Sequence, residues 1–370
     1  MKIACVLLLV ALMVHESSQR LTVSGKTFRL NNQQVFLSGG NLPWINYARD
    51  FGNHQWSKVK PKIEEQIRLL HQAGGNTMRL WVHIQAESSP KFSSSGFVTA
   101  PDNDGTLLND IKDLLDTALK YDVLIIPCLW NGAVNQDNAH RLEGLVTNQQ
   151  KLQSYIDKAL KPMVAKVKGH KALGAWEIIN EPEGLMIPGV KDNTKCYDTV
   201  ATQNDGMGWA AHKYKYKDML RFINWQAAAV KAVDPGALVT MGVWNPKSNT
   251  DHFGKVNHYS DACLRLAGGK HAGVLDFYQF HSYSWQNKWD NVSPFVNSAS
   301  AYGLNKPIVV GEFWEKESAG MNMNELFSYA YNHGYAGAWS WDLMTYGPSQ
   351  RAGMTHIKNL SNHGKVHIDL

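Results

Sequence analysis

The sequence contains few cysteines and only a small excess of positive charge. Four of its 370 residues are cysteine, and 37 basic residues stand against 32 acidic ones, which gives a formal net charge of +5. The basic residues form no long run, so the sequence has no pattern typical of a nucleic-acid-binding protein. The cysteine and histidine spacings do not match a zinc site, and we expect neither a metal nor another cofactor.

Long apolar stretches are also scarce. Only residues 3–14 form an almost wholly apolar run. About twelve residues are too few to cross a bilayer but suit the hydrophobic core of a signal peptide. The small residues Ser17 and Ser18 follow, so we expect a signal peptide at 1–18, cleaved near its end, and one mature domain at 19–370. We expect the product to be secreted into the extracellular space, without a membrane anchor, as a monomer.

Cleavage would remove Cys5 and leave three cysteines. An odd number in an oxidising compartment predicts one disulfide and one free thiol. Cys128 lies in an apolar segment, where a thiol usually serves as a small buried hydrophobic group. Cys196 and Cys263 lie in polar segments and are therefore the predicted disulfide pair.

Short apolar segments alternate with amphipathic ones along the whole chain, without a linker or a break in composition. The segments predicted as strands are 35–41, 76–82, 123–129, 174–181, 238–243, 275–280, 306–313 and 337–342. Those predicted as helices are 60–73, 107–120, 149–168 (with an interruption at Pro162), 218–233, 294–302 and 323–332. Eight alternating strands predict an α/β fold, a single-domain (β/α)8 TIM barrel. A doubly wound open sheet is the alternative, but it requires a Gly-rich phosphate-binding turn, for which Gly39-Gly40 alone is too short.

Two predicted strands end in a glutamate. Pro182 stops the fourth strand and leaves Glu181 at its carboxyl end, and Glu312 ends the seventh. Either glutamate alone is equally explained as a turn residue or an ion-pair partner. Because the carboxyl ends of barrel strands share one rim, the two are expected to face one another as an acid/base residue and a nucleophile for glycoside cleavage.

Other polar residues share these strand ends. Arg79 is expected to orient the Glu312 carboxylate, lower its pKa and so keep it ionised. Asn180 can bind a sugar 2-hydroxyl. The hydroxyl of Tyr283 can donate a hydrogen bond to the nucleophile, and His281 can form a hydrogen bond near the acid/base residue. Each of the four also has a purely structural interpretation, as an ion pair, a turn cap or part of the core.

Aromatic residues are frequent, with 13 Trp and 14 Tyr. Their usual role is core packing, but a flat ring at the rim of a barrel can also stack on a sugar. Trp341 is expected to form the floor of a sugar subsite. The other stacking candidates at or after strand ends are Trp44, Trp130, Trp244 and Trp285.

The sequence resembles glycoside hydrolase family 5 at these positions. The matching motifs are Thr77-Met78-Arg79-Leu80, Trp176 to Pro182, His281-Ser282-Tyr283, Gly311-Glu312-Phe313 and Trp339-Ser340-Trp341-Asp342. The run from Trp176 to Gly184 is similar to that of secreted invertebrate β-1,4-mannanases, including those of molluscs. The resemblance implies that Glu181 is the acid/base residue and Glu312 the nucleophile, and that Arg79, Asn180, His281, Tyr283 and Trp341 bind substrate.

These observations predict an endo-β-1,4-mannanase that cleaves mannan, galactomannan or glucomannan with retention of configuration. An endo-β-1,4-glucanase with the same two glutamates is the first alternative, because the two substrates differ in the orientation of one hydroxyl group. A carbohydrate-binding protein without turnover is the second. The expected partner is a polysaccharide, with neither nucleic acid nor a membrane involved.

Overall fold

The strands form a closed parallel barrel in a computed structural model that describes residues 20–362 and 364–370. The signal peptide expected at 1–18 lies outside the described residues. In order around the barrel, the strands are β4 (Leu37–Asn41), β5 (Thr77–Ile84), β8 (Leu124–Asn131), β9 (Trp176–Asn180), β10 (Val239–Val243), β11 (Tyr278–His281), β12 (Ile308–Glu312) and β13 (Gly337–Ser340). Because β13 pairs with β4, the sheet has no free edge, which confirms the barrel and excludes the open sheet.

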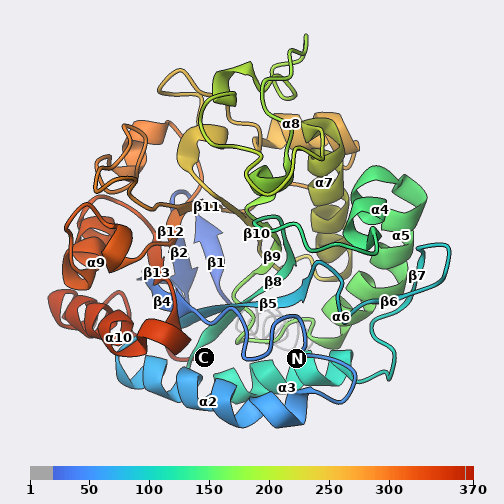
Figure 1. Cartoon of the computed structure of the whole chain (residues 1–370). Helices are drawn as coiled ribbons and strands as arrows, with labels where there is room; N and C mark the ends of the chain where they lie inside the picture. The colour runs from blue at the N-terminus through green and yellow to red at the C-terminus, as the bar shows by residue number, and fades with distance from the viewer. Residues whose placement is uncertain (1–19, 363) are drawn as a thin grey trace, which may run out of the picture.

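Helices surround the barrel, as Figure 1 shows. They are α2 (Trp56–Gln72), α3 (Leu107–Leu119), α4 (Arg141–Thr147), α5 (Gln149–Tyr155), α6 (Lys161–Lys166), α7 (Tyr216–Val233), α8 (Asp261–Gly268), α9 (Met323–Asn332) and α10 (Leu343–Leu360). Apolar spacing explains how they pack: α2, for example, buries Val59, Ile63, Ile67 and Leu70 on one face. None of the described helices is long and apolar enough to span a membrane.

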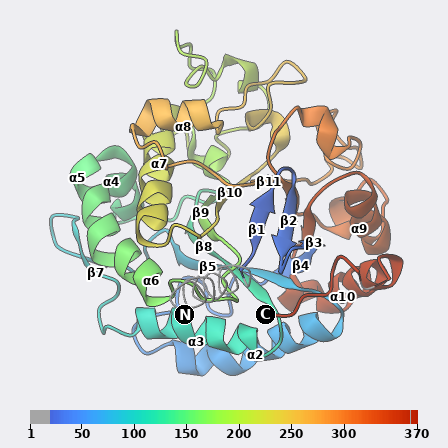
Figure 2. The same ribbon diagram turned by 180° about the vertical axis from the view of Figure 1, so that it is seen from behind.

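A small antiparallel sheet covers the amino-terminal end of the barrel. It consists of β1 (Thr22–Ser24), β2 (Thr27–Leu30) and β3 (Gln33–Val35), and Figure 2 shows β1 and β2 on the near side of the barrel. Phe28 of β2 packs edge-on against Phe277, with 4.9 Å between ring centroids, and Trp339 also packs edge-on against Phe277. This apolar plug closes one end of the barrel, which leaves the carboxyl ends of the strands as its open mouth.

Some predicted elements differ from those observed. The helix expected at 149–168 contains a π-helical turn at Ile156–Leu160, just before Pro162, whose missing N–H explains the break in the hydrogen-bond ladder. The helix expected at 294–302 is wrong, because only a 3-10 turn at Ala299–Tyr302 forms there. Elements not predicted are the hairpin β6 (Lys91–Phe92) and β7 (Val98–Ala100), and the helices α4, α8 and α10.

The predicted disulfide is confirmed. Cys196 and Cys263 are joined across 67 residues of sequence, which connects the long loop after β9 to α8, and Cys128 is buried as a free thiol. Because a cross-link over a loop of this length restricts the unfolded chain, it is expected to contribute about 2–4 kcal/mol of stability.

Replacing Cys196 and Cys263 together by serine should therefore lower the free energy of unfolding by about 2–4 kcal/mol. Urea denaturation of the variant and of the wild type measures the difference. Wild-type protein unfolded under reducing conditions should match the variant. Equal stability of variant and oxidised wild type would contradict this role for the disulfide.

Candidate active site

The two predicted glutamates lie together at the mouth of the barrel. Glu312 is the last residue of β12, and Glu181 directly follows β9. At Glu181 the backbone adopts a left-handed conformation, with φ of 43°, and Pro182 then begins a 3-10 turn. Such a conformation is costly for a residue other than glycine and is more frequent at functional sites than elsewhere. Both side chains are largely buried, with 13% of Glu181 and 6% of Glu312 exposed.

Arg79 is the central positive charge of the site. From β5, its Nη1 donates to an oxygen of Glu312 at 2.6 Å and to Asn41 Oδ1 at 2.8 Å. Its Nε and Nη2 form a bidentate pair with Glu177 at 2.5 and 2.6 Å, and Nη2 also donates to Asn180 Oδ1 at 2.7 Å. The guanidinium is fully buried. These contacts fix the position of Glu312, because a planar guanidinium with this many bonds has little freedom to move.

Asn180 is held from both sides. Its Oδ1 accepts from Arg79, while its Nδ2 donates to Asn131 Oδ1 at 2.8 Å. An amide nitrogen has two hydrogens, so one remains for another acceptor. Asn41 and Asn131 were not predicted as site residues, although each is the last residue of a barrel strand, β4 and β8, and the strand-end criterion would have found both.

His281 bridges the two glutamates. Its Nδ1 lies 2.7 Å from Glu181 Oε1 and 3.5 Å from Glu312 Oε2. Its Nε2 lies 3.1 Å from Gln279 Oε1. The hydroxyl of Tyr283 donates to Glu312 Oε2 at 2.8 Å. One oxygen of each glutamate and one ring nitrogen of His281 all lie within 4.8 Å of one another.

Burial shifts the protonation equilibria of these groups in different directions. Burial raises the pKa of Glu181 to about 7, against the opposing charge of Arg79 and with a smaller contribution from Glu177. It also raises the pKa of Glu312, although His281 and Arg79 act in the opposite direction. Burial lowers the pKa of His281 to about 4. The expectation that Arg79 gives Glu312 a low pKa is thus wrong in its net direction, because desolvation outweighs the contact.

The spacing of Glu181, His281 and Glu312 would also fit three ligands of a metal ion. Each member, however, already has a partner. Glu312 accepts from the Arg79 cation and from a tyrosine hydroxyl, and the ring nitrogen of His281 faces Glu181 at hydrogen-bond distance. These contacts favour proton transfer and charge stabilisation by the side chains themselves.

The predicted tryptophans have different environments. Trp341 is half-buried beside Trp81, edge to face at 5.8 Å between ring centroids. Trp244 is half-buried, and its ring lies 6.2 Å from that of Trp209, which was not predicted and is partly exposed on the loop after β9. Trp285 is 79% exposed on the loop after β11. Trp44 is half-buried against Trp81.

The prediction for Trp130 is wrong. Its side chain is fully buried, its indole N–H donates to Gln226 of α7 at 2.9 Å, and its ring packs against Tyr155 and Phe222. Regular alternation along β8 would turn Trp130 toward the barrel interior. The pairing of β5 with β8 shifts register at this point, and Asn131 instead of Trp130 reaches the site.

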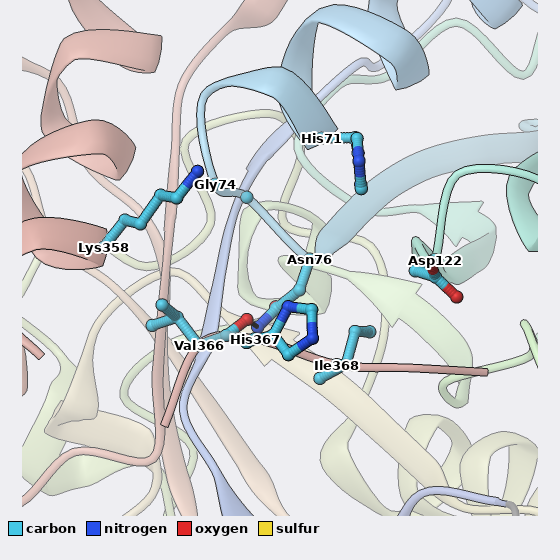
Figure 3. Close-up of a pocket in the computed structure, with 9 residues that line it drawn as sticks. His71, Gly74, Asn76, Asp122, Lys358, Val366, His367 and Ile368 are labelled. Carbon is cyan, nitrogen blue, oxygen red and sulfur yellow. Dashed lines mark hydrogen bonds between the residues drawn. The ribbon is translucent and has the colours of Figure 1, made fainter. Parts of the chain in front are cut away.

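A separate pocket of about 230 Å³ lies at the other end of the barrel (Figure 3). Its lining includes Asn76 and Asp122, which precede β5 and β8, together with His71, Lys358 and His367. None of the predicted site residues lines it. The amino-terminal end of a barrel usually serves stability, and the mouth with its two glutamates is the candidate active site.

Comparisons with known proteins identify the family of the chain. No family model matches the chain. A β-1,4-mannanase structure from the sea hare Aplysia kurodai is 64% identical, covers 95% of this chain and 100% of its own, and superimposes with a TM-score of 0.94. A mannan endo-1,4-β-mannosidase from Mytilus edulis is 48% identical over 352 residues, which is 95% of each chain.

A third relative, the mannan endo-1,4-β-mannosidase of Cryptopygus antarcticus, is 44% identical over 92% of this chain and 91% of its own. These matches cover nearly the whole length of the chain. The chain therefore belongs to the mannan endo-1,4-β-mannosidase family, the mannanases of glycoside hydrolase family 5.

Proposed function

We propose that this chain hydrolyses internal β-1,4-mannosidic linkages of mannan, galactomannan and glucomannan with retention of configuration. The observation that carries the proposal is the pair of carboxylates at the barrel mouth, with one oxygen of each within 4.8 Å of the other. Retaining glycosidases hold their carboxyl groups about 5–5.5 Å apart, whereas inverting ones need roughly 6.5–9.5 Å to admit a water molecule. The mannan preference is inferred from the similarity of the chain to mannan endo-1,4-β-mannosidases.

The reaction then has two displacements. In the first, an oxygen of Glu312 forms a bond to the anomeric carbon while Glu181 donates its proton to the departing glycosidic oxygen. In the second, Glu181 removes a proton from water, whose oxygen replaces Glu312 at the anomeric carbon. Two inversions restore the original configuration, and both glutamates return to their starting protonation states.

The neighbouring residues support these steps. Arg79 and Tyr283 contact different oxygens of Glu312 and hold it for attack. The free amide hydrogen of Asn180 is available to the sugar 2-hydroxyl, a contact that strengthens in the transition state. The half-buried rings of Trp341 and Trp244 and the exposed ring of Trp285 supply stacking surfaces for sugar rings.

The pH dependence of kcat/KM should report the pKa of Glu181. Bond cleavage requires protonated Glu181, so activity is retained below its pKa of about 7 and lost as the pH rises through that value. Ionised Glu312 is required as well, and because burial raises its pKa, the acid limb should lie above the ordinary glutamate range. Initial rates on mannohexaose below KM, measured across pH, test this. A profile that stays flat through neutral pH would contradict it.

A substrate comparison tests the assignment. The proposal predicts rapid release of reducing ends from mannan and little from soluble cellulose, whereas an endoglucanase would show the reverse. The Glu312→Gln variant is the control for a binding protein without turnover. If wild type and variant both bind mannan and release equally little sugar, the chain is not a hydrolase.

We further propose that residues 1–18 form a signal peptide and that residues 19–370 form one secreted, monomeric catalytic domain. The apolar run at 3–14 and the disulfide between Cys196 and Cys263 support export to an oxidising compartment. Amino-terminal sequencing of protein recovered from culture medium should begin near residue 19. Light scattering of that material should give the mass of a single chain.

A further inference from the structure

A continuous chain of buried hydrogen bonds crosses the barrel interior below the two glutamates. It begins at Arg79, whose Nε and Nη2 donate to Glu177 at 2.5 and 2.6 Å. Gln279 Nε2 lies 3.1 Å from Glu177 Oε2, and Gln279 Oε1 lies 3.1 Å from His281 Nε2. His281 Nδ1 then lies 2.7 Å from Glu181 Oε1. Three strands, β5, β9 and β11, contribute to this path, which ends at Glu181 directly after β9.

Arg79 determines which atom donates and which accepts in every hydrogen bond of this path. Arginine can only donate, so Glu177 accepts from it as a carboxylate. Glu177 must therefore also accept from Gln279, which turns the amide nitrogen of Gln279 toward Glu177 and its carbonyl oxygen toward His281. A carbonyl oxygen can only accept, so the hydrogen of the neutral imidazole must be on Nε2.

The tautomer of His281 determines which group donates in the hydrogen bond between His281 and Glu181. With the hydrogen on Nε2, Nδ1 of His281 has only a lone pair to offer. A bond of 2.7 Å to Glu181 then requires that the carboxyl group of Glu181 donates, which means that it carries the proton. After Glu181 has given its proton to the leaving group, its carboxylate faces that lone pair without a hydrogen between them, which favours return of a proton from water.

Small residues on the neighbouring strands make room for these hydrogen-bonded side chains. Arg79, Glu177, Gln279 and His281 are each fully buried. A Cβ at Gly311 on β12 would lie 2.3 Å from Gln279 Cγ, and one at Gly242 on β10 would lie 2.7 Å from His281 Nε2. Glycine on both strands that flank β11 is therefore a condition for the position of Gln279 and His281.

We propose that Gln279 is a positioning residue that fixes the Nε2–H tautomer of His281 and thereby keeps Glu181 protonated for catalysis. This inference rests on the proposed role of Glu181 as the acid/base residue. The low pKa of His281, about 4, is consistent with a neutral ring throughout the working range.

Three other charged groups lie around Gln279 and His281. From β9, Glu177 lies on the far side of Gln279. From β12, Glu312 approaches His281 Nδ1 at 3.5 Å, and from β5, Arg79 contacts both Glu177 and Glu312. Gln279→Met removes no charge from this set, so a change in the titration of Glu181 would report the tautomer.

In Gln279→Met, Nε2 of His281 loses its acceptor, and the ring is expected to place its hydrogen on Nδ1 instead. Nδ1–H then stabilises ionised Glu181, so the alkaline limb of kcat/KM on mannohexaose should move down by about one pH unit. Activity on a β-mannobioside with a dinitrophenyl leaving group, which needs no proton, should remain within about threefold of wild type.

Gln226→Met is the matched control. Gln226 is also fully buried, on α7, and makes two hydrogen bonds, to the Trp130 indole and the Phe222 carbonyl. The Gln226→Met variant should have a lower free energy of unfolding, but the alkaline limb of its kcat/KM profile should not move. If both variants leave the limb in place, or if Gln279→Met lowers activity equally on both substrates, Gln279 has only a structural role and the proposal is wrong.

Neutron crystallography of the wild-type protein gives an answer that does not depend on either variant folding. At about one pH unit below the pKa of Glu181, deuterium is expected on His281 Nε2 and on the Glu181 carboxyl group, with none on Nδ1. Deuterium on Nδ1 beside an ionised Glu181 would overturn the proposal. Failure of the acid/base role itself would be seen separately, in the azide products of Glu181→Ala described below.

Discussion

Replacing Glu312 by alanine is expected to lower kcat/KM on mannan by about 10⁴-fold or more, because the variant lacks the atom that forms the covalent intermediate. The loss should be equally large on a dinitrophenyl β-mannobioside, since a better leaving group does not replace a nucleophile. Steady-state rates on the two substrates measure it. Glu317→Ala is a matched control on the following loop, where the glutamate is exposed, and should retain wild-type activity.

Azide added to Glu312→Ala should restore turnover of the dinitrophenyl substrate and give the α-mannosyl azide. The small anion enters the space left by the carboxylate and attacks once, so the configuration inverts. NMR of the product identifies the anomer. Formation of the β-azide, or residual activity close to wild type, would contradict the assignment of Glu312 as nucleophile.

Replacing Glu181 by alanine is expected to lower kcat/KM on mannan by about 10²–10⁴-fold, because the leaving oxygen must then depart without a proton. The first displacement on the dinitrophenyl substrate should be much less affected, since that leaving group is stable as an anion. The covalent intermediate would accumulate, because the base that activates water is also missing. A rapid burst of dinitrophenol followed by slow turnover is the measurement.

Azide distinguishes this variant from the previous one. In Glu181→Ala the anion should attack the covalent intermediate from the face that water normally uses and give the β-mannosyl azide. The two variants thus predict opposite anomers from the same substrate and the same anion. An α-azide from Glu181→Ala, or equal losses on both substrates, would show that Glu181 is not the acid/base residue.

The barrel could be predicted because its strands are short apolar runs with clear ends. Pro182 stops one strand directly after Glu181, and the run before Glu312 is equally well defined. Strand ends were therefore located well enough to bring His281 and the two glutamates to one rim, where the structure has them close together. Arg79 lies within β5 and not at its end, and it contacts Glu312 from there.

What could not be predicted depends on register and burial. Trp130 was expected to face the mouth, but a shift in pairing between β5 and β8 turns it outward and brings Asn131 to the site. The role of Gln279 was not visible either, since a glutamine within a strand gives no sign of which two partners it joins. Helix α8 was not predicted because its main local sequence signal is the N-cap residue Ser260. One capping residue is too weak a signal to predict a helix without its tertiary contacts.

The direction of the pKa shift of Glu312 also depends on burial and could not be predicted from the sequence. A neighbouring arginine predicts a lowered pKa for Glu312, and Arg79 does contact Glu312 as expected. The extent to which the barrel excludes water decides the net direction, and this depends on the packing of every strand at once. Burial raises the pKa of both glutamates, and only the three-dimensional structure reveals that.

Glu181 and Glu312, held at the ends of β9 and β12 on one rim of the barrel, are proposed to carry out a double displacement on a mannan chain. The most direct test follows the anomeric protons of the products of mannohexaose by NMR from the first seconds of hydrolysis. With retention, the new reducing ends should appear as the β-anomer and convert only later to the α-anomer by mutarotation. First appearance of the α-anomer would mean a single displacement by water and would contradict it.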